Sequence, residues 1–127
     1  MTTGFDPRQG LVVIRARIWG PLDSALVRLA VDTGATRTLI NESIIRVLGF
    51  PADAVSQRVQ ITTGSGIESA PLIVLSKIAA LGHQRRNVSV ICHSLPPTAS
   101  VDGLLGLDFL RNRNLSIDFR SGRISLK

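Results

Sequence analysis

The order of apolar and polar residues along the chain predicts a protein built mainly from β-strands. Apolar and polar positions alternate over residues 11–19 and again over 25–31, as in strands with one buried face. A Gly-Pro pair and further turn residues at 20–24 separate the two runs, so we expect a hairpin. Further strands are expected within residues 57–79, 86–93 and 115–127.

Two short segments interrupt this pattern and favour helices. Asn41 is a good N-cap residue, apolar residues follow at helical spacing, and Gly49 comes where a helix would end. We therefore expect one helix at about residues 42–48. A second can begin at Leu107. The predicted fold class is mainly β, with one or two short helices.

Length and composition indicate one globular domain. The chain has 127 residues, 44% of them apolar, with four Phe, one Trp and no Tyr. Aliphatic side chains therefore supply most of the predicted core. We expect an N-terminal extension at residues 1–10 and a single domain over residues 11–127.

The basic charge of the chain gives little evidence for a particular partner. Fifteen Lys and Arg against nine Asp and Glu give a net charge of +6, but the cations are scattered and only Arg85-Arg86 form a close pair. No aromatic residues alternate with them, as they would in a surface for single-stranded nucleic acid. We therefore expect a solvated basic surface and no nucleic-acid partner. A nucleic-acid-binding β-barrel remains an alternative that rests on charge alone.

The N-terminal residues lack a basic segment followed by an apolar one, and no apolar run approaches the length of a membrane span. A soluble, cytoplasmic chain without a membrane partner is therefore predicted. Cys92 is the only cysteine, and it lies within an apolar run beside His93. We expect a buried, inert thiol, and neither a metal ion nor a cofactor.

Residues 29–40 contain one acid, Asp32, between two apolar runs. Such flanks predict a carboxylate that is almost completely buried, which is costly unless neighbours stabilise it. Thr33 offers a hydroxyl, Gly34 can donate its backbone N–H to the carboxylate, and Ala35 is small. An ordinary Asp-Thr-Gly turn is the alternative.

Two later stretches bear on this loop. Leu104 and Leu105 form a very short apolar strand closed by Gly106. Between it and Asp32, a predicted hairpin has a flexible polar tip of Thr62, Thr63, Gly64, Ser65 and Gly66, which is also compatible with a simple turn.

Together, the Asp-Thr-Gly-Ala run at 32–35 and the Leu-Leu-Gly run at 104–106 resemble the retropepsin-like aspartic peptidases. This single-lobe family includes the retroviral proteases, and residues 103–110 look more like its cellular and bacterial members. The resemblance covers residues 10–127 and implies a closed β fold in which the strand at 104–106 frames the Asp32 loop. It also implies a flap at residues 62–66, here without a tyrosine.

Peptide hydrolysis by this chemistry needs two carboxylates that share a proton. The chain contains one Asp-Thr-Gly, so we expect a homodimeric aspartic endopeptidase in which each subunit contributes Asp32. By resemblance, Thr33 would hydrogen-bond to the partner's loop, and the substrate is a peptide or protein. The C-terminal hairpin at about 115–127 is the expected dimer element, because its apolar side chains would need cover, namely Leu115, Ile117, Phe119, Ile124 and Leu126.

A second acid, Asp108, follows Gly106 closely. We expect it to cap the short helix or to pair with Arg37 rather than to act in catalysis. A retropepsin-like binding or scaffold domain without activity is the main alternative function.

Overall fold

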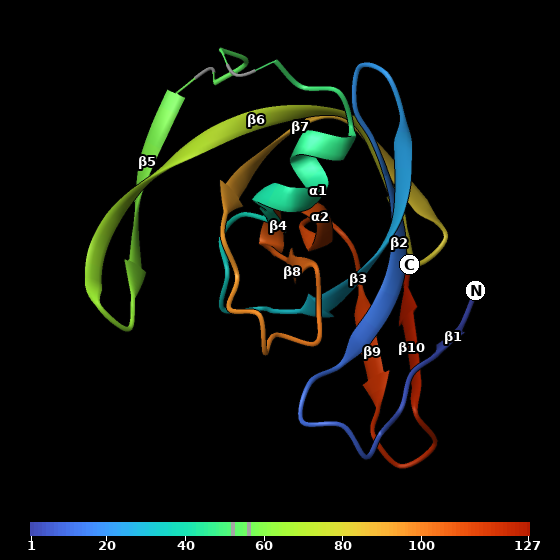
Figure 1. The fold of residues 1–127 in the computed structure, drawn as a ribbon. Coiled ribbons are helices and arrows are strands. Elements are labelled where there is room, and N and C mark those ends of the chain that lie inside the picture. Colours follow the sequence, from blue (N-terminus) through green and yellow to red (C-terminus); the bar gives the residue numbers. More distant parts are fainter. Residues whose placement is uncertain (52, 56) are drawn as a thin grey trace.

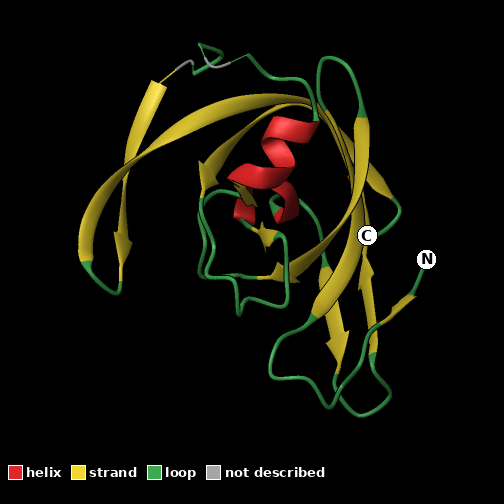
Figure 2. Ribbon diagram, viewed as in Figure 1, coloured by secondary structure: helices red, strands yellow, loops and turns green. Residues whose placement is uncertain are grey.

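Strands dominate the computed structural model, which describes residues 1–51, 53–55 and 57–127 (Figures 1 and 2). The mainly β fold class predicted from the sequence is confirmed. Among the described residues the strands are β1 Thr3–Gly4, β2 Val13–Trp19, β3 Ser24–Val31, β4 Leu39–Asn41, β5 Gln57–Thr63, β6 Gly66–Ala80, β7 His83–His93, β8 Gly103–Leu105, β9 Leu115–Asp118 and β10 Arg123–Leu126. In the described part of the chain, no helix is long and apolar enough to cross a membrane.

Seven strands form a closed barrel in the order β2-β3-β8-β4-β7-β6-β5, and β2 also pairs with β6. The alternation predicted for β2 is confirmed: Ile14, Ala16 and Ile18 are buried, while Arg15 and Arg17 are exposed. Inward-facing aliphatic residues of neighbouring strands, with Phe109, make the main core, and Ala70, Leu72 and Ile91 form a second, smaller cluster. Burial of these side chains is the main driving force for the fold.

Short helices in the part of the chain that the structure describes are α1 Glu42–Val47 and α2 Leu107–Leu110. The Asn41 side chain accepts a hydrogen bond from the Ser43 N–H at 3.4 Å, so the predicted N-cap is confirmed. Gly49 follows the helix with a φ of +86°, a backbone conformation that favours glycine. Both helices lie within the arch of the long strands (Figure 2).

The β5–β6 hairpin projects from the barrel at the left of Figure 1. Its register pairs Thr63 with Gly66, which leaves Gly64 and Ser65 as the two-residue turn. The predicted hairpin and its polar tip are therefore present.

A three-stranded sheet in the order β1-β10-β9 lies beside the barrel. The C-terminal hairpin is present as predicted, but the expected exposure of its apolar face is wrong. Ile124 and Leu126 are buried, and Leu115 and Ile117 pack half-buried on the same core. Only Phe119 of that set is exposed, because β9 ends at Asp118.

Strand β8 fits between β3 and β4 through an unusually close backbone contact. It pairs parallel with β3 and antiparallel with β4, with Gly103 opposite Ile40. A Cβ on Gly103 would lie 2.0 Å from the carbonyl oxygen of Leu39. Because the obstructing atom belongs to the backbone, a side chain at this position requires the strands to move apart.

We predict that Gly103→Ala destabilises the protein by on the order of 3 kcal/mol or more, because overpacking at a backbone contact cannot be relieved by a rotamer change. Gly64→Ala is the control, since a Cβ at that position meets nothing within 4 Å. Urea unfolding followed by circular dichroism measures both variants. Equal stability of the two variants would contradict the prediction.

Candidate active site

Asp32 follows β3 directly, in a loop whose backbone is attached to β8. The Asp32 N–H donates to the carbonyl of Leu105 at 3.0 Å, and the Ala35 N–H donates to the carbonyl of Asp32 at 3.2 Å. On the other side, the Leu107 N–H donates to the carbonyl of Ala35 at 2.8 Å. The loop is therefore tied to β8 and to the start of α2, the framing that the resemblance implied for residues 104–106.

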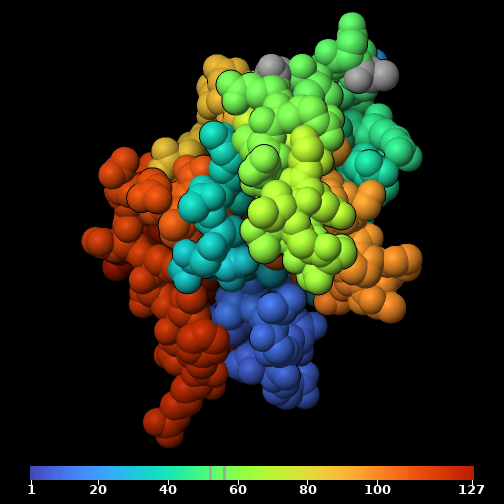
Figure 3. All heavy atoms as spheres, turned by 90° about the vertical axis from the view of Figure 1, so that its left-hand side faces the viewer, coloured from blue at the N-terminus to red at the C-terminus, as the bar shows by residue number. Residues whose placement is uncertain are grey.

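The Asp32 carboxylate accepts the backbone N–H of Gly34 at 2.8 Å, as the sequence predicted. The expectation of near-complete burial is wrong, since Asp32 is half-buried and Thr33 and Gly34 are exposed. The flanking apolar segments enter the barrel walls while the loop itself stays at the surface. Figure 3 shows this segment in cyan at the surface, beside the yellow-green β5–β6 hairpin.

A buried threonine holds the base of the loop. Thr38 is the buried polar residue of the described core, with no exposed surface. Its hydroxyl donates to the Asp108 carboxylate at 2.7 Å and accepts the Gly106 N–H at 3.1 Å, and its N–H donates to the second Asp108 oxygen at 2.9 Å. The Thr38 and Asp108 side chains thus fix each other, because a partly buried carboxylate is stabilised when its oxygens are hydrogen-bonded.

These hydrogen bonds give Asp108 a structural role. The alternative of an ion pair with Arg37 is wrong, since no such pair exists among the described residues. The N-cap of α2 is Gly106, without a side-chain cap, while Asp108 lies in the first turn and accepts the Phe109 N–H at 3.0 Å. An acid near the start of a helix interacts favourably with the helix dipole, and Asp108 has this location. Its main hydrogen-bond partner, however, is Thr38.

Gly106 is required by the same packing. A Cβ there would lie 2.6 Å from the carbonyl carbon of Arg37 and 2.8 Å from the carbonyl oxygen of Ala35. The Leu-Leu-Gly run therefore allows the Asp32 loop to pass directly over β8.

A groove of about 580 Å³ runs between the Asp32 loop and the β5–β6 hairpin. Gly34 and Ala35 form one side, and strand β5 forms the other. Most of the remaining lining is aliphatic: Leu39, Val59, Ile61, Ile91 and Leu104. An extended peptide with apolar side chains fits the chemistry of such a surface.

The hairpin residues predicted as a flap differ in position. Thr62 lines the groove, whereas the Thr63 hydroxyl bonds within the turn, to Ser65 and to the carbonyl of Gly66. Gly64, Ser65 and Gly66 are exposed at the tip. Sequence reasoning missed the groove residues Val59, Ile61 and Ile91, although the alternation in residues 57–63 could have identified the first two.

Cys92 and the histidines do not extend the site. Burial raises the pKa of the Cys92 thiol, which disfavours a reactive thiolate. His93 contacts Glu68 of β6 at 3.3 Å, and the ring of His83 lies 2.6 Å from the carbonyl of Leu126. Across the described residues, no group of three or more His, Cys, Asp or Glu side chains could hold a metal ion.

The fold and this loop define the class of aspartic proteases with a single lobe, and comparisons with known proteins agree. The family model described as "gag-polyprotein putative aspartyl protease" matches residues 20–112. The chain belongs to this retropepsin-like aspartic protease family.

A solved structure of a retropepsin-like aspartic protease from Rickettsia conorii has the same fold, with a TM-score of 0.73 and 20% sequence identity. The match covers 99% of this chain and 88% of that one. No curated protein matches the chain.

We predict that Thr38→Val lowers the free energy of unfolding by about 2 kcal/mol, because the Asp108 carboxylate and the Gly106 N–H each lose a buried partner. Thr36→Val is the matched control, since Thr36 is exposed and bonded to neither group. Chemical denaturation of the two variants tests this. A Thr38→Val protein as stable as the control would show that the hydroxyl contributes nothing.

Proposed function

We propose that the protein is an aspartic endopeptidase that acts as a homodimer, with Asp32 as the catalytic residue. The protease domain proposed here spans residues 11–127. The observation that carries the proposal is the position of Gly34, which binds the Asp32 carboxylate at 2.8 Å and also lines the aliphatic groove. A peptide in this groove would place its backbone beside the carboxylate.

One carboxylate alone cannot perform the reaction. In the proposed dimer, one ionised Asp32 accepts a proton from a water molecule while the other, protonated, donates a hydrogen bond to the scissile carbonyl oxygen. The water oxygen adds to the carbonyl carbon, and the resulting tetrahedral intermediate breaks its C–N bond as the amide nitrogen takes a proton from an Asp32 carboxyl group. No metal or cofactor takes part in this scheme.

The requirement for two acids supports a dimer, and retropepsin-like proteases generally act as dimers on protein substrates. Thr33 is exposed, and its hydroxyl makes no hydrogen bond within the described part of the protomer. We assign it to contacts with the partner's loop. Ala35 lines the groove beside Gly34, where its small side chain leaves space for substrate.

The β5–β6 hairpin is the proposed flap. It forms the wall of the groove opposite the Asp32 loop and has a small, polar tip at residues 63–66. With no tyrosine in the chain, Gln60, Thr62 and the backbone of β5 are groups that can hydrogen-bond to a substrate backbone from this side.

The C-terminal hairpin remains our candidate dimer element, for a different reason from the one the sequence suggested. Its inward side chains are already covered by the protomer's own core, but β9 is an edge strand of its sheet in the described structure. An edge strand offers unpaired backbone groups to a second copy, and Phe119 adds an exposed apolar side chain next to it.

We predict that Asp32→Asn lowers proteolytic activity by about 10³-fold or more, since general acid–base catalysis is lost. Cleavage of an unstructured protein at acid pH, with pepstatin as inhibitor, measures activity. Asp53→Asn, an exposed acid elsewhere, is the control. If wild type and Asp32→Asn proved equally inactive while both were dimers, the binding or scaffold alternative would replace the proposal.

Deleting residues 121–127 is a poor test of dimerisation, because it removes the buried Ile124 and Leu126. We predict instead that Ser116→Glu, on the exposed face of β9, shifts the protein toward monomer and lowers activity in parallel. Ser100→Glu adds the same charge in an exposed loop and serves as control. Sedimentation velocity measures both, and a Ser116→Glu dimer of unchanged affinity would exclude the β9 edge.

A further inference from the structure

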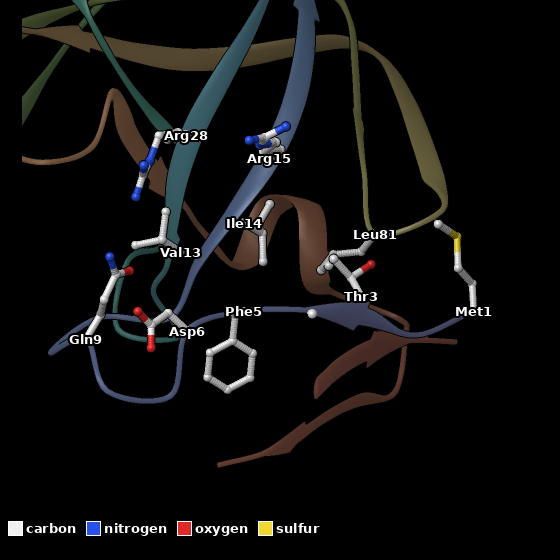
Figure 4. Close-up of a pocket in the computed structure, with 11 residues that line it drawn as sticks. Met1, Thr3, Phe5, Asp6, Gln9, Val13, Ile14, Arg15, Arg28 and Leu81 are labelled. Carbon is white, nitrogen blue, oxygen red and sulfur yellow. The ribbon is translucent and has the colours of Figure 1, made fainter. Parts of the chain in front are cut away.

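A second cavity lies on another side of the molecule, between the N-terminal segment and the β2–β3 hairpin. Its volume is about 510 Å³, within the range typical of small-molecule sites. Phe5, Val13 and Leu81 supply apolar lining, and the guanidinium groups of Arg15 and Arg28 lie along the β2–β3 side (Figure 4). It shares no lining residue with the groove beside Asp32.

Without a bound ligand, the positions of the two arginines are electrostatically unfavourable. Arg15 and Arg28 are direct partners in the antiparallel β2–β3 register, so their side chains lie on the same face of the sheet. Like charges directly opposite each other destabilise a strand pair. Neither guanidinium forms an ion pair or a hydrogen bond within the described structure.

The nearby acids are already engaged elsewhere. Asp6 lines the cavity, but its carboxylate bonds to Arg8, at 3.0 Å to the backbone and 3.2 Å to the side chain. That side-chain bond holds the pKa of Asp6 below its usual value. Asp102 accepts the backbone N–H of Arg28 at 2.8 Å rather than its guanidinium. Neither acid therefore neutralises the arginine pair, so an external anion can bind to it.

We propose that this cavity binds a small organic anion, with a carboxylate or phosphate group at Arg15 and Arg28 and an apolar body against Phe5, Val13 and Leu81. Arginine side chains suit this recognition because their planar groups donate paired hydrogen bonds to such anions. Binding of the head group would also remove the repulsion between the two cations. The proposal does not depend on proteolysis.

Isothermal titration calorimetry with octanoate and octyl phosphate tests the proposal on the full chain. Both anions share an apolar body, so their relative affinities show which head group the arginines prefer. Octanol tests the need for the charge, and acetate tests the need for the apolar body. We expect at least one of the two eight-carbon anions to bind about tenfold or more tightly than either octanol or acetate.

Arg15→Gln and Arg28→Gln should each weaken binding about tenfold, because a charge-assisted hydrogen bond is lost. Arg17→Gln is the matched control: Arg17 lies on the same face of β2 but bonds to Ser24 and does not line the cavity. The affinity of the Arg17→Gln protein for the anion should change less than twofold. The unliganded Arg15→Gln and Arg28→Gln proteins should melt no lower than wild type, since only a like-charge contact is removed.

Three results would overturn the proposal: neither eight-carbon anion binding at millimolar concentration, octanol binding as tightly as octanoate and octyl phosphate, or Arg17→Gln weakening binding as much as the cavity variants. A lower melting temperature of both cavity variants would also overturn it, by giving the arginines a structural role. Because the readouts are binding and melting, an inactive protease would leave this test unaffected.

Discussion

The close passage of the Asp32 loop over strand β8 is the constraint on which the rest of the molecule depends. Two glycines make it possible, since side chains at Gly103 and Gly106 would meet backbone atoms at 2.0 and 2.6 Å. The short strand can then pair with β3 on one side and β4 on the other. Without this insertion, neither the barrel wall nor the support beneath Asp32 would form.

The polar contacts of the site follow from that packing. Once β8 lies under the loop, Thr38 is buried and must satisfy its hydroxyl, while Asp108 must satisfy a carboxylate. The Thr38 hydroxyl donates to the Asp108 carboxylate, and the same hydroxyl accepts the Gly106 N–H. The rigid base leaves Asp32 itself half-buried at the surface, where a groove of aliphatic side chains begins. Proteolysis, as proposed here, uses a surface carboxylate on a well-packed support.

The two cavities differ in the chemistry they offer. The groove beside Asp32 combines aliphatic residues with Thr36, Arg37, Gln60 and Thr62 and is bordered by the hairpin, which suits an extended chain. The cavity beside β2 and β3 combines an apolar lining with two cations that lack partners among the described residues. The basic surface seen in the sequence is therefore not uniform, because strand register brings Arg15 and Arg28 together.

Local pattern was sufficient for the mainly β fold, the α1 cap at Asn41 and the Asp32 loop with its Gly34 hydrogen bond, because alternation, capping and turn chemistry act over a few residues. Strands β1 and β4 are too short to show a period, so only their partners reveal them. The burial of Ile124 and Leu126, the Thr38–Asp108 pair and the Arg15–Arg28 pair join segments distant in sequence. Only the tertiary structure decides such contacts, because the chain must close into a barrel before these residues meet.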